Sequence, residues 1–322
     1  MHHVAFVVYP GFELLDMSGP VAVFDGANHV LTQAGKTPFY AVEVISSDGG
    51  LIRSSSGVTV QSLPPGALGS RPDTLLVMGA REEELMREIA DPALRAWLPK
   101  LANKVPRFGS VCSGAFVLAS LKLLDGRCVA THWNACAPLA KAYPRVKVDA
   151  DSLYVVDDNL WSSAGVSTGI DMALAMVTND LDSATASQVA RGLVIYARRA
   201  GFQSQFSPLL QAQTKADSPF AELIAWLMSN LHAPLDVSAL AARAGLSERT
   251  FHRRFVEATG ETPARFVESA RLDAARMLLS RGASPKFVAS RVGLAPAARF
   301  TEAFERRFGV TPRLFRETHA EA

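Results

Sequence analysis

The chain has 322 residues, of which 48% are hydrophobic and 20% charged, and its formal net charge is +2. This length exceeds that of an ordinary single domain, and the composition supports a large buried core. No run of about 18 uninterrupted apolar residues is present, so no membrane-spanning helix is expected. Residues 3–9 are expected to form a buried strand and not a signal peptide. Three cysteines cannot all pair, so we expect reduced thiols and a cytoplasmic location.

Apolar strand-like runs alternate with helical segments in the first half of the chain. We predict strands at residues 3–9, 41–45, 74–78 and 108–111, and helices at residues 14–31, 82–101 and 115–123. Strands this apolar are covered on both faces, as in a parallel sheet flanked by helices. The pattern therefore predicts a doubly wound α/β domain that continues to about Thr178, closed by a further helix over residues 184–200.

The segment Ser110–Ala115 places Cys112 between the end of a strand and the start of a helix. This is the arrangement of a nucleophile elbow, with sulfur in place of oxygen. The amides of a helix N-terminus are expected to lower the pKa of such a thiol. We expect Gly79 to offer an amide to an oxyanion, and Glu13 or Asp16 to approach the sulfur. The alternative is that Cys112 is a small residue packed at a crowded strand end.

Three residues at four-residue spacing, Cys128, His132 and Cys136, suggest a metal site. However, Cys128 falls in a predicted strand, residues 127–130, so a helical spacing does not hold through it. No fourth ligand is evident, whereas closed zinc sites have four. We therefore expect neither a metal nor a cofactor. For His132 the alternatives are a hydrogen-bonded core histidine and the wall of a pocket near the elbow.

Two tryptophans and one glycine-rich segment also have alternative interpretations. Trp133 and Trp161 could line a cage for a cationic ligand, but buried tryptophans more often pack in a core. The segment Gly165–Gly169 lacks the lysine of a phosphate-binding loop, so we expect it to have a structural role and not to bind phosphate. A polar stretch, residues 202–217, then links a first domain, residues 1–201, to a tail over residues 218–322.

The tail contains one pattern twice, and such a repeat is the strongest signal in the chain. Residues 240–246 (LAARAGL) are followed by two phenylalanines, a glycine and a Thr-Pro pair, and residues 288–294 (VASRVGL) are followed by the same series. Each copy predicts a short helix, a glycine turn and a second helix with a phenylalanine stripe. Residues 264–280 predict one rigid helix between the copies. A helix-turn-helix unit can place its second helix in the major groove of DNA, and neighbouring grooves are ~34 Å apart.

The outer faces of the two second helices are the candidate DNA-reading surfaces. The residues expected to contact DNA are Ser247, Glu248, Arg249, His252, Arg253, Ala297, Ala298, Arg299, Thr301 and Glu302. Residues 218–322 hold 15 Lys and Arg against 11 Asp and Glu. The excess is modest, so we expect affinity to depend on a homodimer or on adjacent proteins. A helical solenoid is the alternative, but solenoids need about three or more repeats and only two are visible.

Residues 220–316 resemble the DNA-binding domain of the AraC family of bacterial transcription regulators. The resemblance is carried by Gly245-Leu246-Ser247, by Arg271-Leu272, and by residues 300–304 (FTEAF) leading to residues 308–312 (FGVTP). The family usually has polar residues at the start of the second recognition helix, where this chain has Ala295-Pro296-Ala297-Ala298. The second unit is therefore expected to grip phosphates or to contact thymine methyl groups.

Residues 4–201 resemble the PfpI/ThiJ superfamily, and the whole chain resembles GlxA-type regulators of the AraC family. The first resemblance is carried by residues 9–12 (YPGF), by residues 112–119 (CSGAFVLA) and by residues 131–133 (THW). It implies a flavodoxin-like fold in which Asp16 is the acid beside Cys112. Peptidase-like members have His directly after the cysteine and often Gly after Gly79, whereas this chain has Ser113 and Ala80.

The resemblance implies that the first domain senses a small metabolite, such as an amine, an amino acid or a quaternary ammonium compound. The expected effector-binding residues are Asp16, Gly79, Cys112, Ser113, His132 and Trp133. We therefore predict an effector-responsive, DNA-binding transcription activator that acts as a homodimer with RNA polymerase. The alternative is a cysteine-dependent amidase, hydratase or glyoxalase-like enzyme fused to a DNA-binding domain. A third possibility is a first domain that only dimerises.

Overall fold

The protein is described by a computed structural model covering residues 1–195, 199, 201, 205, 220–259, 261–308 and 310–319. The chain divides into two compact units, residues 1–205 and 206–322. Each unit is considered by itself below. The predicted linker, residues 202–217, lies outside the described residues except for Gln205, which is hydrogen-bonded within the first unit.

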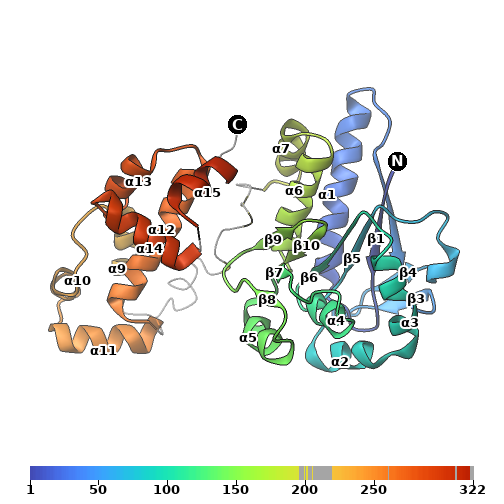
Figure 1. Cartoon of the computed structure of the whole chain (residues 1–322), viewed down its shortest axis with the longest axis horizontal. Helices are drawn as coiled ribbons and strands as arrows, with labels where there is room; N and C mark the ends of the chain where they lie inside the picture. The colour runs from blue at the N-terminus through green and yellow to red at the C-terminus, as the bar shows by residue number, and fades with distance from the viewer. Residues whose placement is uncertain are drawn as a thin grey trace. The chain divides into compact units, whose positions relative to one another are not determined.

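The first unit is built on a six-stranded sheet (Figure 1). Its strands are β1 (His2–Val7), β2 (Tyr40–Ile45), β5 (Thr74–Val77), β6 (Arg107–Val111), β9 (Tyr154–Asp157) and β10 (Leu160–Ser163), in the order β2-β1-β5-β6-β10-β9. Every pair is parallel except β9 with β10 at one edge. The order of the five parallel strands is that of a flavodoxin-like doubly wound sheet, which confirms the predicted fold class.

Two short strand pairs accompany the main sheet. One joins β3 (Gly50–Arg53) to β4 (Thr59–Ser62), and the other joins β7 (Cys128–Val129) to β8 (Lys147–Val148). A single-turn 3-10 helix spans Pro65–Ala67. The sequence signalled only β7 among these elements, because strands this short carry too few residues for a periodic pattern.

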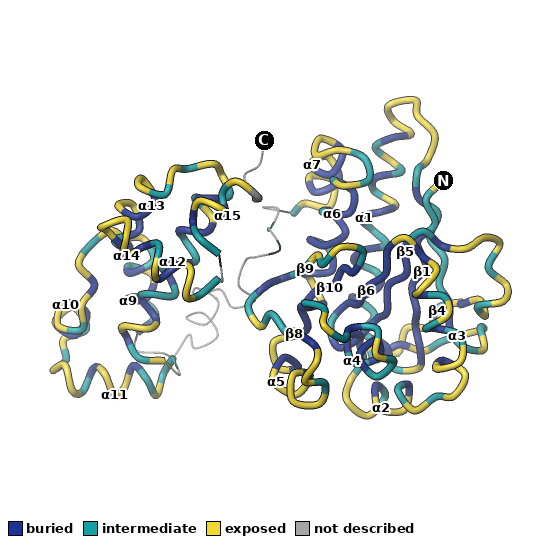
Figure 2. Tube along the Cα trace, viewed as in Figure 1, coloured by how far each residue is buried: buried dark blue, intermediate teal, exposed yellow. Residues whose placement is uncertain are grey.

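Helices cover both faces of the sheet, as expected for a sheet whose strands are mostly apolar (Figure 2). One face packs against α1 (Leu14–Gln33), α6 (Thr168–Asp180) and α7 (Ser183–Gly192), and the other against α2 (Glu82–Ala90), α3 (Pro92–Ala102), α4 (Gly114–Ser120) and α5 (Trp133–Ala142). Side chains of β1 alternate between the two cores, with Val4 and Phe6 in one and Ala5 and Val7 in the other. All four are completely buried.

Three predicted helices differ substantially in extent from the observed ones. The predicted helix over residues 115–123 ends earlier, since α4 spans Gly114–Ser120. The predicted helix over residues 82–101 is two helices, because the Asp91 carboxylate accepts hydrogen bonds from the amides of Ala93 and Leu94 and Pro92 opens a new helix. The predicted helix over residues 184–200 is also wrong in extent, since α7 ends at Gly192. Residues 196–198 and 200 of that prediction lie outside the described residues.

The second unit is helical throughout its described part. Its helices are α9 (Ala221–Ser229), α10 (Val237–Arg243), α11 (Glu248–Thr259), α12 (Pro263–Ser280), α13 (Pro285–Arg291), α14 (Ala297–Phe308) and α15 (Pro312–His319). The pairs α10–α11 and α13–α14 are the two predicted helix-turn-helix units, and α12 is the long helix between them. The turns contain Gly245 and Gly293, whose φ angles of +66° and +71° favour glycine.

Phenylalanines bury the inner faces of both second helices. Phe251 and Phe255 of α11 pack on Phe220, with ring centroids 5.5 and 5.4 Å away. In the other half, the rings of Phe300 and Phe304 lie 5.5 Å apart. All five are buried. The repeated phenylalanine pattern in the sequence therefore marks the faces that hold each unit together. No helix in the described part of the chain is long and apolar enough to cross a membrane.

Candidate effector site and DNA-reading surface

Cys112 occupies a strained turn between β6 and α4, as the sequence predicted. Its φ angle is +57°, which is uncommon for a residue other than glycine. Small neighbours are required: a Cβ atom on Gly165 would overlap the Cys112 side chain, and one on Gly114 would overlap the Val77 carbonyl oxygen. The elbow geometry is therefore confirmed, and β5 and the segment after β10 close around it.

Asp16 lies beside Cys112, although it comes from the start of α1. Its side chain is completely buried. Oδ1 accepts a hydrogen bond from the Val166 amide at 2.7 Å, and Oδ2 accepts one from the Gly79 amide at 3.2 Å. Burial raises the pKa of this carboxyl to about 6, although the two amides and the hydrogen bond from the Cys112 thiol act in the opposite direction.

The Cys112 thiol is held in its neutral form. Burial, followed by the Asp16 charge, raises the pKa of the thiol well above its ordinary range. Hydrogen bonds with Ser113 act in the opposite direction but are outweighed. The prediction that the start of the helix lowers this pKa is therefore wrong, because burial and the neighbouring acid outweigh the helix amides.

The expected oxyanion-binding amides are already engaged. The Gly79 amide donates to Asp16, and the Ala80 amide donates to Ser113 Oγ at 3.0 Å. The Ser113 hydroxyl in turn donates to the Ala80 carbonyl at 2.7 Å. The proposed role of Gly79 as an oxyanion donor is therefore wrong for this conformation. Ser113, where peptidase-like proteins have a histidine, ties the elbow to the loop after β5.

His132 and Trp133 lie at the start of α5, as its N-cap and its first residue. The Thr131 hydroxyl donates to the Cys112 carbonyl at 2.8 Å, which brings the start of α5 against the elbow. The His132 Nδ1 atom lies 2.5 Å from Asn134 Oδ1, and its ring centroid lies 5.4 Å from that of the half-exposed Trp133. Within the described residues, no hydrogen bond joins the His132 ring to the thiol. His132 thus follows the residue that contacts the elbow, and its own ring contacts Asn134 and Trp133.

The segment after β10 is part of the site, and sequence reasoning missed it. Val166 supplies an amide to Asp16 and has a φ angle of +52°, while Gly165 packs against Cys112. The signal for this segment in the sequence is its glycine-rich composition, which indicates a structural role and not a ligand site. Trp161 is a core residue packed in the sheet, so it forms no cage with Trp133. Among the described residues, no cluster of ligands could hold a metal ion.

The first candidate DNA-reading surface lies on α11 (Glu248–Thr259). Ser247 caps this helix, since its hydroxyl accepts a hydrogen bond from the Thr250 amide at 3.4 Å. Glu248, Arg249, His252 and Arg253 are all exposed, as predicted. Arg254, which the prediction omitted, is exposed beside them. In the described part of the unit, none of these cationic side chains has an ion-pair partner, so their charge is available to an anionic polymer.

The second surface, on α14, is less cationic. Ala297, Ala298, Arg299 and Glu302 are exposed. The Thr301 hydroxyl donates to the Ala297 carbonyl at 2.9 Å, so its donor is engaged within the helix. Further along, Arg306 pairs with Glu268 and Arg307 donates to Ser269 Oγ at 2.9 Å, both on α12. These arginines attach α14 to the central helix, and Arg299 is the exposed cation of α14 that pairs with no described residue.

Comparisons with known proteins agree with this two-unit organisation. The model of the DJ-1/PfpI family matches residues 2–179, and the model of a helix-turn-helix domain matches residues 240–318. The transcriptional regulator CdhR of Pseudomonas aeruginosa is 28% identical over 310 residues, which cover 95% of this chain and 89% of that protein. The transcriptional regulator GlxA of Rhizobium meliloti is 26% identical, covering 97% of this chain and 94% of that protein.

A solved structure supports the fold of the first unit. A ThiJ/PfpI family protein from Pseudomonas syringae superposes with a TM-score of 0.55 at 20% identity, covering 70% of this chain and 86% of that chain. The class of the protein is shown by the two family models and by the relatives that match almost the whole chain. The chain belongs to the DJ-1/PfpI family, and its AraC-type helix-turn-helix unit makes it a DNA-binding transcriptional regulator.

Proposed function

We propose that this regulator activates transcription in response to a small cationic metabolite that binds beside Asp16 and Cys112. We further propose that it acts in the cytoplasm as a homodimer and contacts RNA polymerase. The proposed effector site rests on one observation: the buried Asp16 carboxylate lies next to a neutral thiol. Both are at the strand ends, where doubly wound sheets bind ligands.

A cationic ligand fits the charges around this site. Glu13 acts on both Asp16 and Cys112 and raises the pKa of each, after the larger effect of burial, so two carboxyl groups lie within electrostatic reach of each other. Trp133, whose indole is half-exposed, begins α5 two residues after Thr131, whose hydroxyl donates to the Cys112 carbonyl. Carboxylates and an aromatic face are the groups that recognise amines and quaternary ammonium compounds. This favours an amine, an amino acid or a quaternary ammonium compound as the effector.

An enzyme is the alternative, but the chemistry of the elbow does not favour it. Nucleophilic catalysis by cysteine needs a thiolate, which an adjacent base or a lowered pKa supplies. Here the pKa of the Cys112 thiol is raised, and its neighbour is an acid whose own pKa is about 6. Ser113 stands where a base would follow the cysteine. We therefore propose that Cys112 shapes the effector site and contacts the effector, and that it does not turn over a substrate.

The path from the effector site to the DNA-binding unit begins at Gln205. Its side-chain amide donates to the carbonyls of Thr131 and Ser152 at 3.0 and 3.1 Å. Thr131 also holds the Cys112 carbonyl. Arg199 pairs with Asp171 of α6 and donates to Ser167, next to Val166. A ligand that moves the walls of the site would therefore pull on the chain where it leaves the first unit.

The test combines ligand binding with promoter output. The full chain is screened by thermal shift against amines, amino acids and quaternary ammonium compounds, because a ligand that binds only the folded state raises its melting temperature. The hit is then assayed with Cys112→Ser and with Cys128→Ser, a control thiol in β7. We expect wild type and Cys128→Ser to activate a reporter with the hit, and Cys112→Ser to need a higher concentration without losing activation.

Two results would contradict this function. Consumption of the hit by the wild type, abolished in Cys112→Ser, would establish the enzyme instead. If no compound in the three classes changes the melting temperature, and the first unit only associates with itself, then it serves dimerisation alone. The transmission step has its own test: Gln205→Ala is expected to retain ligand and DNA binding while the ligand no longer changes transcription.

A further inference from the structure

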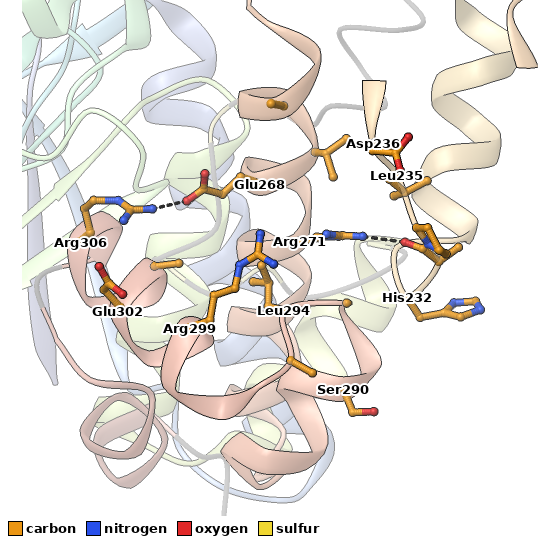
Figure 3. A pocket seen from close by; sticks show the side chains of 17 residues that line it. His232, Leu235, Asp236, Glu268, Arg271, Ser290, Leu294, Arg299, Glu302 and Arg306 are labelled. Carbon is orange, nitrogen blue, oxygen red and sulfur yellow. Dashed lines mark hydrogen bonds and ion pairs between the residues drawn. The ribbon is translucent and has the colours of Figure 1, made fainter. Parts of the chain in front are cut away.

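A cleft of about 810 Å³ lies at the junction between the two helix-turn-helix motifs of the second unit (Figure 3). Its walls come from residues 232–236 ahead of α10, from the first half of α12, from the turn at residues 293–295 and from α14. Both motifs thus contribute to one cleft. Of the predicted DNA-contacting residues, Arg299 and Glu302 line this cleft, and the effector site lies elsewhere.

Arg271 of α12 fastens the two motifs to each other within this cleft. Its Nε atom donates to the Leu231 carbonyl at 3.0 Å, and Nη2 donates to the Ala233 carbonyl at 2.7 Å. Gly293, in the turn of the second motif, packs so closely that an added Cβ would lie 2.8 Å from Nη2. Carbonyl oxygens accept these hydrogen bonds but carry no formal charge, so the guanidinium remains a net cation.

Arg299 of α14 adds a second cation to the same cleft. In Figure 3 its guanidinium extends toward that of Arg271. Within the described residues, Arg299 has neither a hydrogen bond nor an ion pair. Burial, followed by the charge of Arg299, lowers the pKa of Arg271. Two like charges within electrostatic reach of each other repel, and an anion close to both would reduce that repulsion.

The acidic residues of the cleft do not neutralise this pair. Glu268 forms an ion pair with Arg306. Asp236 caps α10 by accepting a hydrogen bond from the Ala239 amide at 2.8 Å. The carboxylate of Glu302 points away from Arg299, toward Arg306, in Figure 3. The two arginines therefore form a site of positive charge that no carboxylate of the described residues neutralises.

We propose that Arg299 and Arg271 bind one backbone phosphate of the DNA duplex at the junction between the two motifs. The inference rests on the DNA-binding function and adds a contact that reads no base. Guanidinium groups suit phosphate because they donate in pairs. Arg299 follows Ala297 and Ala298, which have no side-chain donors for base edges. The second motif is thereby suited to positioning the protein on the backbone while α11 reads sequence.

The test measures the salt dependence of binding for Arg299→Ala in the full chain. The probes are a duplex that the wild type selects from a random-sequence pool and an unrelated duplex of equal length. One lost phosphate contact reduces the slope of log affinity against log salt by about 0.9, so wild-type affinity should fall about 3.5-fold more than that of the variant between about 50 and 200 mM salt. The change should be the same on both duplexes.

Two controls sharpen this measurement. Arg299→Lys keeps the charge and is expected to keep the slope. Arg281→Ala removes the same charge just beyond the far end of α12, outside the cleft, and should leave the slope unchanged. Because Arg299 is exposed and bonded to no described residue, its substitution should not disturb folding.

Each other result has a definite meaning. An unchanged slope for Arg299→Ala would overturn the phosphate site. A loss confined to the selected duplex would also overturn it, because Arg299 would then read a base. If the wild type selected no duplex from the pool, the DNA-binding function itself would fail, and the inference with it.

Discussion

Replacing Asp16 by asparagine should change how the stability of the first unit depends on pH. Burial raises the pKa of Asp16 from 3.8 to about 6 in the folded protein. A raised pKa means that the folded state favours the protonated acid. The stabilising effect of the protonated carboxyl is complete below pH 3.8 and is lost as the pH rises through about 6. Ionisation of Asp16 therefore destabilises the fold by about 3 kcal/mol at high pH.

The expected signal is a difference between two titration curves. From pH 5 to 7.5, the free energy of unfolding of the wild type should fall by about 1.4 kcal/mol relative to that of Asp16→Asn. The variant also has one oxygen where Asp16 has two, so either Gly79 or Val166 loses its acceptor. That loss is a constant offset of about 1–3 kcal/mol and does not depend on pH.

Urea unfolding at several pH values would measure this difference. Three of the four tryptophans, Trp97, Trp133 and Trp161, lie in the first unit and report its transition by fluorescence. Glu88, whose pKa burial and then Asp91 raise to about 7, is present in both proteins and cancels in the difference. Asp25→Asn, at an exposed position on α1, is the matched control. The measured quantity is the unfolding free energy of the wild type minus that of Asp16→Asn. If it stays constant or rises with pH, Asp16 does not have a raised pKa in the folded protein.

Three further substitutions test other parts of the structure. Gly165→Ala should destabilise the first unit by about 1–3 kcal/mol in urea unfolding, because the new Cβ would overlap the elbow; Gly35→Ala, at a positive φ in open space, should cost less, and equal losses would argue against the close packing. Phe251→Ala should destabilise the second unit by about 3–5 kcal/mol, as for a buried aromatic, and a loss under 1 kcal/mol would contradict its place in the core. Arg249→Ala should weaken binding to a selected duplex by about 1–3 kcal/mol in a gel-shift titration. The control Arg313→Ala removes a cation paired with Glu317 on α15 and should leave binding unchanged. If Arg249→Ala weakens binding to unrelated DNA by the same amount, Arg249 contacts a phosphate and not a base.

The helices, turns and strands that a local sequence pattern determines could be predicted from the sequence. The doubled motif predicted both helix-turn-helix units, because a glycine with positive φ and phenylalanines four residues apart, such as Phe251 and Phe255, determine turn and buried face together. The apolar runs predicted four parallel strands for the same reason. The break at Asp91 could also have been predicted, because an aspartate cap followed by proline is a local signal for a new helix.

The candidate site could be predicted only in part. The elbow at Cys112 follows from its neighbours in sequence, and family resemblance placed Asp16 beside it. The contact of Val166 with Asp16 joins residues 150 positions apart, and no local pattern encodes it. The raised pKa of the thiol likewise depends on how deeply the folded chain buries it. Such properties depend on tertiary packing, which periodicity and composition do not determine.

The most direct test of the whole account is a competition between two duplexes for the full chain. A duplex selected from a random-sequence pool is titrated against an unrelated duplex at about 150 mM salt, because affinity without a stated salt concentration has no clear meaning. We expect the selected duplex to bind at least ~10³-fold more tightly, the lower end of the range for specific regulators. Equal binding of the two duplexes would contradict it.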